Sequence, residues 1–259
     1  YLIMNSQTGA VCSRTILKRN VVNLMRILLT GILPQTVWIM AARLLRGGHQ
    51  VSVLGHTEAH AQKPAGVTLH DLHPGNAGAL NIMEASRFSA VVFFFANQCE
   101  DARAYGSVQG AMLDALFAML HASERCGVER FALVTDRRVF GASQQGREGE
   151  TPLPDTPTGV LIKAAEDCLH CGAPDSLSTL LVRVTSLYAP GDSDSFFAHA
   201  AACSREGRDF VLAGNEQTPC DFLHADDLAI FLDAALENGL RGVAHVGYGV
   251  KRAYGEVVA

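Results

Sequence analysis

The sequence predicts an α/β fold built on a doubly wound parallel sheet, with a small lobe at the C-terminal end. Short apolar runs alternate with segments of helical periodicity over most of the chain, which is typical of a parallel sheet. One run, Ala90–Phe95, is apolar at every position, as expected for a strand covered on both faces. With 259 residues, 48% of them hydrophobic, the chain is long enough to bury a sizeable core.

The individual elements follow from the same alternation. The strands predicted for the main sheet are Met25–Thr30, Val51–Leu54, Val67–Leu69, Ala90–Phe95, Phe131–Val134 and Leu180–Val184. The helices predicted between them are Ile39–Leu45, Gly110–Cys126 and Leu161–Leu169. The smaller elements predicted after Tyr188 are a helix over Phe196–Arg205, a strand over Phe210–Leu212, a helix over Asp226–Glu237 and a strand over Val243–Gly247.

We therefore expect three parts. Residues 1–24 form an N-terminal extension of unknown role, residues 25–188 form the sheet domain, and residues 189–259 form the small lobe. We allow for the exchange of a strand and a helix between the lobe and the main domain.

Charge and composition exclude several classes of partner. The net charge is −5 and no basic block occurs, so nucleic acid is not expected as a partner. No apolar run approaches the roughly 20 residues that span a bilayer, and Tyr1–Leu24 lacks the apolar core of a signal peptide. We expect a cytoplasmic protein whose 7 cysteines are reduced. Cys168 and Cys171 are the one close pair, and no metal site is predicted from them.

The first strand–helix–strand unit, Met25–Gly55, has the length of a dinucleotide-binding unit. A nucleotide-binding version would carry glycine three and six residues after Gly31, where this chain has Pro34 and Val37. Proline has no N–H to offer a phosphate, and valine is bulky where helix and strand must approach closely. The fold pattern and the cofactor pattern therefore disagree.

Taken together, these segments resemble the extended short-chain dehydrogenase/reductase family, the NAD-dependent nucleotide-sugar epimerases and dehydratases. The blocks that carry the resemblance are Met25–Gly31, Arg46–Gly55, Cys126–Asp136, Val182–Asp192, Asp221–Ala229 and Val246–Gly249. The resemblance implies a Rossmann-like sheet domain and a C-terminal substrate lobe that is shortened at Ala259. It also implies NAD or NADP as cofactor, a nucleotide or nucleotide-sugar ligand, and a homodimer formed through helices 110–126 and 159–171.

The resemblance assigns the cofactor contacts one by one. Gly31 fits the first glycine of the pyrophosphate turn, and Gly55 stands where an acidic residue would hold the ribose. Asp71 and Leu72 match the pair that flanks adenine, although Asp71 serves equally well as a loop acid or a helix cap. Ala96, just after the fourth strand, completes the implied cofactor contacts.

The implied catalytic residues depart further from the family. Its members use Tyr-x-x-x-Lys on one helix face, where the lysine lowers the tyrosine pKa and the tyrosine is the general acid or base. Lys163 fits the lysine, but Gly159 stands four residues before it. Thr158 occupies the sequence context of the tyrosine and is too weak an acid to replace a phenol. Asp136 corresponds to the serine or threonine that assists the tyrosine.

The implied substrate contacts are also altered. Cys220 stands where the family has an arginine that clamps the diphosphate, and His224 matches a substrate-side position. The fitting residues around them, such as Asp221 and Asp227, are interpreted as structural more readily than as catalytic, because acids of this kind cap or pair locally.

Two hypotheses of different classes follow. The first is an epimerase-like protein that has lost standard redox catalysis and acts as a binding or regulatory scaffold. The alternative is an active epimerase, dehydratase or reductase with a rearranged site that uses Asp136 and Lys163. His56, His224 or Thr158 would assist them. A third hypothesis is ordinary NAD(P)-dependent reduction with the cofactor held in an unconventional way. The Arg137–Arg138 pair is basic enough to attract phosphate, but it follows the fifth strand rather than the second and is poorly placed for a 2′-phosphate.

Overall fold

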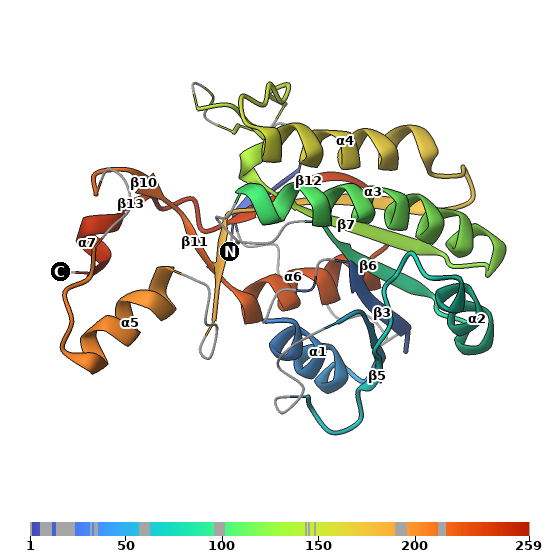
Figure 1. The fold of residues 1–259 in the computed structure, drawn as a ribbon. Helices are drawn as coiled ribbons and strands as arrows, with labels where there is room; N and C mark the ends of the chain where they lie inside the picture. Colours follow the sequence, from blue (N-terminus) through green and yellow to red (C-terminus); the bar gives the residue numbers. More distant parts are fainter. Residues whose placement is uncertain are drawn as a thin grey trace.

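The structure is a computed structural model, and it describes residues 2–5, 12–13, 24–31, 33, 36–56, 63–95, 102–142, 144, 146–147, 149–189, 196–211 and 216–258. The side chains of residues 2–23, 102–109 and 258 are outside the description. The predicted doubly wound parallel sheet is confirmed as the centre of the molecule (Figure 1).

Seven parallel strands form the main sheet, in the order β5, β4, β3, β6, β7, β8, β12. Their bounds are Thr68–His70 (β5), Gln50–Leu54 (β4), Arg26–Gly31 (β3), Ala90–Phe94 (β6), Arg130–Asp136 (β7), Ser178–Val184 (β8) and Gly242–Gly247 (β12). The chain winds outward from β3 in one direction and from β6 in the other. Ligands of such sheets bind at the carboxyl ends of the strands where this reversal occurs.

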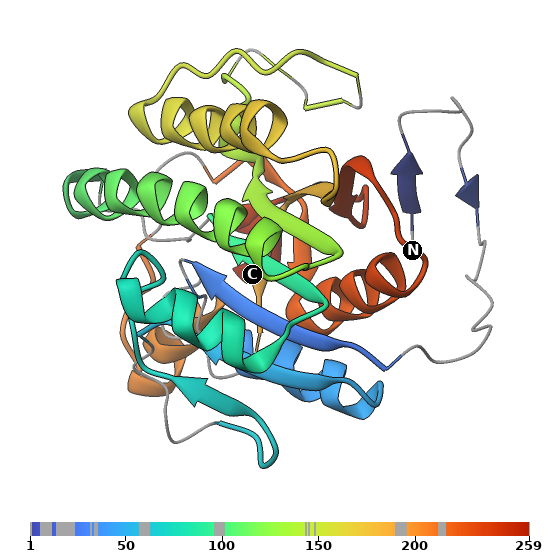
Figure 2. The same ribbon diagram turned by 90° about the vertical axis from the view of Figure 1, so that its right-hand side faces the viewer.

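Two short antiparallel strands extend the sheet beyond β12. Leu2–Asn5 (β1) pairs with β12, and Cys12–Ser13 (β2) pairs with β1. The described part of the N-terminal extension therefore lies at one edge of the sheet (Figure 2).

Helices cover both faces of the sheet (Figure 2). One face carries α1 (Val37–Arg46) and α6 (Ala225–Glu237), which pack on a core that includes Ile27 and Leu29 of β3. The other carries α2 (Ala77–Ser86), α3 (Ala102–Arg125) and α4 (Pro157–Gly172), which pack on a second core that includes Leu28. Alternate residues of one strand thus enter two different cores, and every residue of β6 is buried.

The short helix η2 (Arg137–Val139) connects β7 to α4 and packs against α4. The remaining elements form a lobe beyond the carboxyl ends of the strands, at the left of Figure 1. They are β9 (Ser186–Tyr188), α5 (Phe196–Glu206), β10 (Pro219–Cys220), β11 (Phe222–His224), β13 (Arg252–Ala253) and α7 (Tyr254–Val258). β9 pairs with β11 in parallel, and β10 pairs with β13 in antiparallel fashion. A set of half-buried rings packs them together: Tyr188, Phe196, Phe197, Phe210, Phe222 and Tyr254.

Two details differ from the sequence prediction. The strand predicted over Phe210–Leu212 is wrong for its described residues: Phe210 packs its ring on Phe196 at 5.4 Å, and Val211 is exposed outside any strand. Leu212 lies outside the described residues. The sequence analysis also missed α2, which is rich in alanine and glycine and starts at Asn76, whose side chain accepts the Gly78 N–H.

Candidate ligand-binding crevice

The candidate site is the edge of the sheet at the carboxyl ends of the parallel strands, centred on the switch between β3 and β6, where the crevice of such sheets lies. Gly31 ends β3 with φ +97°, a conformation that favours glycine. A Cβ on Gly31 would stand 2.3 Å from the carbonyl oxygen of Phe94. The close approach of the two strands therefore requires glycine here. Ala96, the other residue implied at this end of β6, lies outside the described residues.

The first turn of α1 borders the same crevice and is apolar. Val37 and Trp38 are buried in the core from the first turn onward. Thr36 occupies the N-cap, but its side chain makes no capping bond, and its buried hydroxyl has no partner among the described residues. Pro34 lies outside the described residues, whereas Val37 fills the space that a third glycine would leave open.

The end of β4 is filled by a neighbouring side chain. Gly55 has φ +150°, and a Cβ placed on it would lie 2.8 Å from Cδ1 of Leu33. Leu33 is half-buried and packs against the core on the α1 side of the sheet. Leucine therefore lies where the side chain of a ribose-binding acid would begin.

Asp71 and Leu72 follow β5 and have local partners. The Asp71 carboxylate lies 2.5 Å from Nδ1 of His56, and both side chains are exposed. This hydrogen bond links the end of β4 to the end of β5. Leu72 is half-buried and packs against the core under α2.

The N-terminal turn of α4 determines which residue can occupy position 159, four residues before Lys163. Thr156 is the N-cap, and its hydroxyl accepts the Gly159 N–H at 3.1 Å. Gly159 is buried: a Cβ there would lie 2.4 Å from the carbonyl oxygen of Arg138 and 2.8 Å from Cβ of Pro154. The position four residues before Lys163 therefore has no room for any side chain.

Asp136 and Lys163 are held by different partners. Asp136 ends β7, caps η2 by accepting the Arg138 N–H at 2.8 Å, and accepts Nε of Arg138 with both oxygens at 3.0 Å. Lys163 donates to Asp167, one helical turn later, at 2.6 Å. No hydrogen bond or ion pair joins these two described side chains. Thr158, the third residue of the predicted set, is half-buried in the first turn of α4.

A buried polar network next to this site was missed by sequence reasoning. Glu166 of α4 accepts Oγ1 of Thr135 at 2.9 Å and two nitrogens of Arg183 at 3.0 and 2.6 Å. The glutamate side chain is 4% exposed and the arginine side chain 11%. Arg183 also contacts Nε2 of His245 at 3.3 Å and lies 5.1 Å from the centre of the Phe140 ring. The available signal was Glu166 itself, a charged residue on the apolar face of α4.

His224 and Asp221 hold the start of α6 and the end of β12. His224 is the N-cap of α6, and its Nδ1 accepts the Asp226 N–H at 3.2 Å. Asp221 is buried and accepts the N–H groups of Tyr248 and Gly249 at 3.2 and 2.8 Å. Both side chains are thus bonded to backbone groups. The substrate-binding role assigned to His224 remains a prediction.

A small neutral cluster stands where the family's diphosphate arginine is expected. Cys220 is buried, with its Sγ 2.8 Å from Oγ of Ser186. Burial and the hydrogen bond with Cys220 raise the pKa of the Tyr254 phenol, while Ser186 and the positive charge of Arg137 oppose that rise. The phenol therefore stays protonated and neutral at physiological pH.

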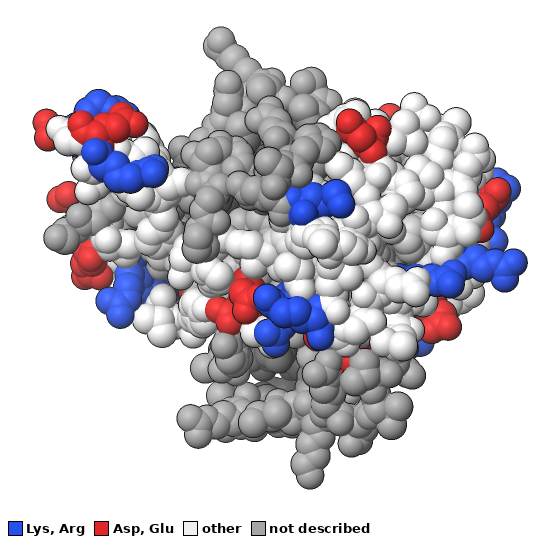
Figure 3. All heavy atoms as spheres, turned by 90° about the horizontal axis from the view of Figure 1, so that it is seen from below, with Lys and Arg blue, Asp and Glu red and all other residues white. Residues whose placement is uncertain are grey.

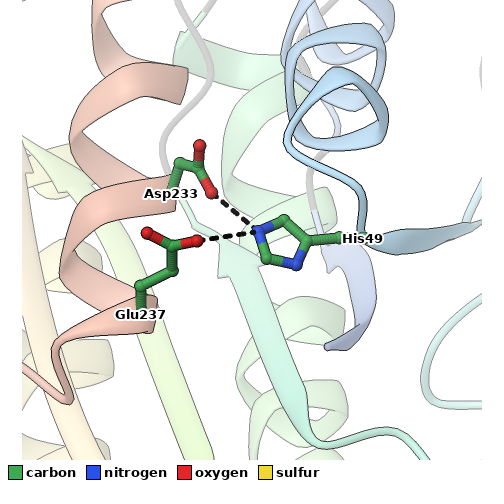
Figure 4. A group of neighbouring side chains, drawn as sticks. All are labelled: His49, Asp233 and Glu237. Carbon is green, nitrogen blue, oxygen red and sulfur yellow. Dashed lines mark hydrogen bonds and ion pairs between the residues drawn. The ribbon is translucent and has the colours of Figure 1, made fainter. Parts of the chain in front are cut away.

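A second group of titratable residues, His49, Asp233 and Glu237, lies between α1 and α6 (Figure 4). It is the one set within the described residues whose ligand atoms are close enough for a metal ion. However, Nδ1 of His49 accepts the Met25 N–H at 3.2 Å, so the ring proton sits on Nε2 and is donated to Asp233 at 2.7 Å. That geometry gives His49 a role in joining β3 to α6 rather than in binding a cation.

The surface adds two observations. In Figure 3 the described basic and acidic residues are interspersed, without a continuous basic area on that face. No helix among the described residues combines the length and apolar character needed to cross a membrane.

Comparison with known proteins places this geometry in a family. The sequence profile of the NAD dependent epimerase/dehydratase family matches residues 27–247. WbmG of Bordetella bronchiseptica, solved with NAD and UDP, superposes with a TM-score of 0.78 at 19% identity, over 91% of this chain and 76% of that one. UDP-glucose 4-epimerase of Thermotoga maritima, solved with UDP-glucose, gives 0.77 at 17% identity, over 90% and 80% of the chains.

A third structure, dTDP-glucose 4,6-dehydratase of Bacillus anthracis in complex with NAD, gives a TM-score of 0.75 at 16% identity, over 90% of this chain and 79% of that one. No curated protein matches the sequence. At these identities the solved structures establish the shared fold, and the profile match establishes membership. The chain belongs to the NAD dependent epimerase/dehydratase family.

Proposed function

We propose that this protein binds a nucleotide or nucleotide sugar as a binding or regulatory scaffold and does not carry out the hydride transfer of its family. The observation that carries the proposal is the packing of Gly159 against the carbonyl oxygen of Arg138. The proposed loss concerns the chemistry, because the sheet and its two cores are complete.

Proton transfer to or from a sugar hydroxyl needs a general acid or base with a suitable pKa within reach of that hydroxyl. The family provides it with a phenol one helical turn before a lysine. Here that position takes no side chain, and Thr158 beside it offers an alcohol of much higher pKa. Asp136 is bound to Arg138, and Lys163 is bound to Asp167.

The residues present also do not fit NAD or NADP held in the family's manner. Gly55 supplies no carboxylate for the ribose, and Leu33 packs into that space. Val37 fills the first turn of α1 with an apolar side chain. We therefore derive no catalytic step through a nicotinamide cofactor.

The ligand class is proposed by analogy with the solved relatives, because a shared fold does not fix a ligand. The structures of WbmG and of the Thermotoga epimerase were solved with UDP and UDP-glucose, respectively. Support from this chain comes from the lobe side of the crevice, where the half-buried Ser186 and Tyr254 offer a hydroxyl and a phenol next to the buried thiol of Cys220.

The test is calorimetric titration with NAD, NADP, UDP and UDP-glucose, with an assay for turnover of each nucleotide sugar in the presence of NAD. We expect binding of UDP or UDP-glucose, no measurable binding of the dinucleotides and no turnover. Tight NAD binding with hydride transfer to a sugar substrate would refute the proposal.

The alternative, an enzyme with a rearranged site, makes the opposite forecast for two residues. If a turnover is found, Asp136→Asn and Lys163→Met should abolish it under that alternative. Asp167→Asn is the matched control, since it releases Lys163 from its ion pair while keeping the lysine.

We further propose that the protein is a cytoplasmic homodimer formed through α3 and α4. Both helices expose large apolar side chains, Phe117 (41% exposed) and Val160 (54%), and Phe117 borders Gly172 at the end of α4. The five cysteines whose side chains are described, at positions 126, 168, 171, 203 and 220, are free thiols, as expected in a reducing compartment. Light scattering of the wild type and of Phe117→Asp tests the dimer, which the aspartate should dissociate.

A further inference from the structure

We propose that Arg137 binds an anionic group of the ligand, a phosphate or a carboxylate, at the lobe side of the crevice. This inference rests on the proposed function, because it assigns a residue to the ligand's charge. The sequence presents Arg137 and Arg138 as one basic pair, and the structure separates their roles.

Arg138 is committed to the protein. It donates Nε to both oxygens of Asp136 and forms an ion pair with that carboxylate through Nη2. Arg137 is exposed, and no described side chain forms an ion pair or hydrogen bond with its guanidinium. An unneutralised arginine at the carboxyl edge of a parallel sheet is well placed for a ligand.

The strand register places Arg137 beside the Ser186–Cys220 contact. Asp136, the last residue of β7, pairs with Val184 of β8. Arg137 directly follows Asp136, and Ser186, whose hydroxyl lies 2.8 Å from Cys220, follows Val184 by two residues, so both residues lie just past the ends of adjacent strands. The positive charge of Arg137 is also felt at the Tyr254 phenol, where it lowers the pKa against the larger effect of burial. Both observations put Arg137 at the neutral cluster of Ser186, Cys220 and Tyr254.

The chemistry of that cluster explains why a charge is needed. Hydroxyl, thiol and phenol groups donate hydrogen bonds but do not compensate a negative charge. A guanidinium does both, because its planar fork matches the two oxygens of a carboxylate or phosphate. Arg137 would thus supply, from the end of β7, the positive charge that Cys220 does not supply from β10.

Arg252 is the competing source of positive charge. It pairs with Cys220 across the β10–β13 ladder and is exposed. Residues directly opposite in an antiparallel pair project to the same face, so Arg252 can approach the cluster from the other side. The experiment must therefore compare the two arginines.

Calorimetric titrations of the wild type, Arg137→Gln, Arg252→Gln and Arg241→Gln should use uridine, UDP, UDP-glucose and UDP-glucuronic acid. The difference in affinity between uridine and UDP measures the contribution of the phosphates. The difference in affinity between UDP-glucose and UDP-glucuronic acid measures the contribution of the carboxylate. We expect the Arg137→Gln variant to bind at least one of the three anionic ligands roughly tenfold or more weakly than the wild type. Its affinity for uridine should be unchanged. Arg241→Gln, at the amino end of β12, should match the wild type.

The outcomes are distinguishable. Equal affinities of Arg137→Gln and wild type for every anionic ligand, or a loss seen in Arg252→Gln instead, would overturn the assignment while leaving the proposed function standing. A wild type that binds none of the four ligands overturns the proposed function, and the inference with it. Because Arg137 is exposed, an unchanged thermal midpoint of the variant verifies that the effect is on binding.

Discussion

The two halves of the crevice differ in what the strand ends carry. At β3 and β4 the strand ends are packed like core: Gly31 touches the backbone of Phe94, and Leu33 covers Gly55. At β7 and β8 the strand ends are polar: Asp136 is bound to Arg138, and Arg183 is buried beside Glu166. Under the proposed function, the dinucleotide half contributes only to the packing of the protein, and the lobe half binds the ligand through the exposed Arg137.

The largest effect that would sharpen this comparison is expected at the buried ion pair. Glu166→Ala leaves the Arg183 guanidinium buried without its partner, which costs about 3–5 kcal/mol of unfolding free energy. Urea unfolding followed by circular dichroism measures it.

The matched control for this pair is the double variant Glu166→Leu with Arg183→Met. Replacing both charges with apolar groups of similar size should bring stability back toward the wild type. A single variant as stable as the wild type would show that the network is not a structural element of the β7–β8 half.

The second effect concerns Gly159. Gly159→Ala places a Cβ 2.4 Å from the Arg138 carbonyl oxygen, and crowding of this kind costs about 1–3 kcal/mol. Gly110→Ala on α3 is the control, because nothing lies within 4 Å of its Cβ position and the helix gains about 1 kcal/mol. The midpoint of thermal unfolding should therefore fall in Gly159→Ala and rise in Gly110→Ala. A stabilised Gly159→Ala would mean that a side chain fits there, and the main support for lost catalysis would disappear.

A smaller effect should appear as pH dependence. Burial, and then the charge of Arg183, lower the pKa of His245 below its ordinary value of about 6.5. The unfolded chain then takes up a proton at higher pH than the folded chain. Stability is thus retained above pH 6.5 and falls as the pH drops through that value toward the folded pKa.

The check is the urea midpoint at pH 7.5 and 5.5 for the wild type and His245→Gln. The variant should lose less stability on acidification, because it cannot bind that proton. Burial also lowers the pKa of His70. Substituting His70 should therefore reduce the loss of stability on acidification in the same way. An identical loss in His245→Gln and the wild type would contradict the proposed environment of His245.

The smallest effect is expected at Lys163. Its ion pair with Asp167 is an exposed pair one helical turn apart, so Lys163→Met should change the unfolding free energy by about 0.3–0.5 kcal/mol. Affinity for UDP should not change. A large loss of UDP affinity in Lys163→Met, with Asp167→Asn unaffected, would move Lys163 into the binding site and favour the enzyme alternative.

Much of the fold could be predicted from the sequence because it depends on local patterns. The apolar run of β6 and the glycines after α1 mark their elements directly. α2 was not predicted because its small residues give a weak periodicity. The strand predicted over Phe210–Leu212 was wrong because Phe210 is covered by a ring contact with α5 and not by a sheet.

The site was less predictable because its contacts join distant positions. Glu166 and Arg183 are separated by a helix end and a strand, and only the sheet topology brings them together. The sequence shows glycine at position 159, but it does not reveal the Arg138 carbonyl behind it. Likewise, the sequence predicts Asp136 as an acid–base group, but its ion pair with Arg138 depends on the geometry of the turn after β7.

Gly31 has a consequence for how such chains are recognised. Because the neighbouring strand leaves no room for a methyl group, this glycine would be retained even if no phosphate ever approached it. Under the proposed function, genome scans that score the first glycine of the turn as a mark of dinucleotide use would count this chain among cofactor binders. Residues 33, 37 and 55 would be better discriminators, because a dinucleotide and an apolar filling make opposite demands on them.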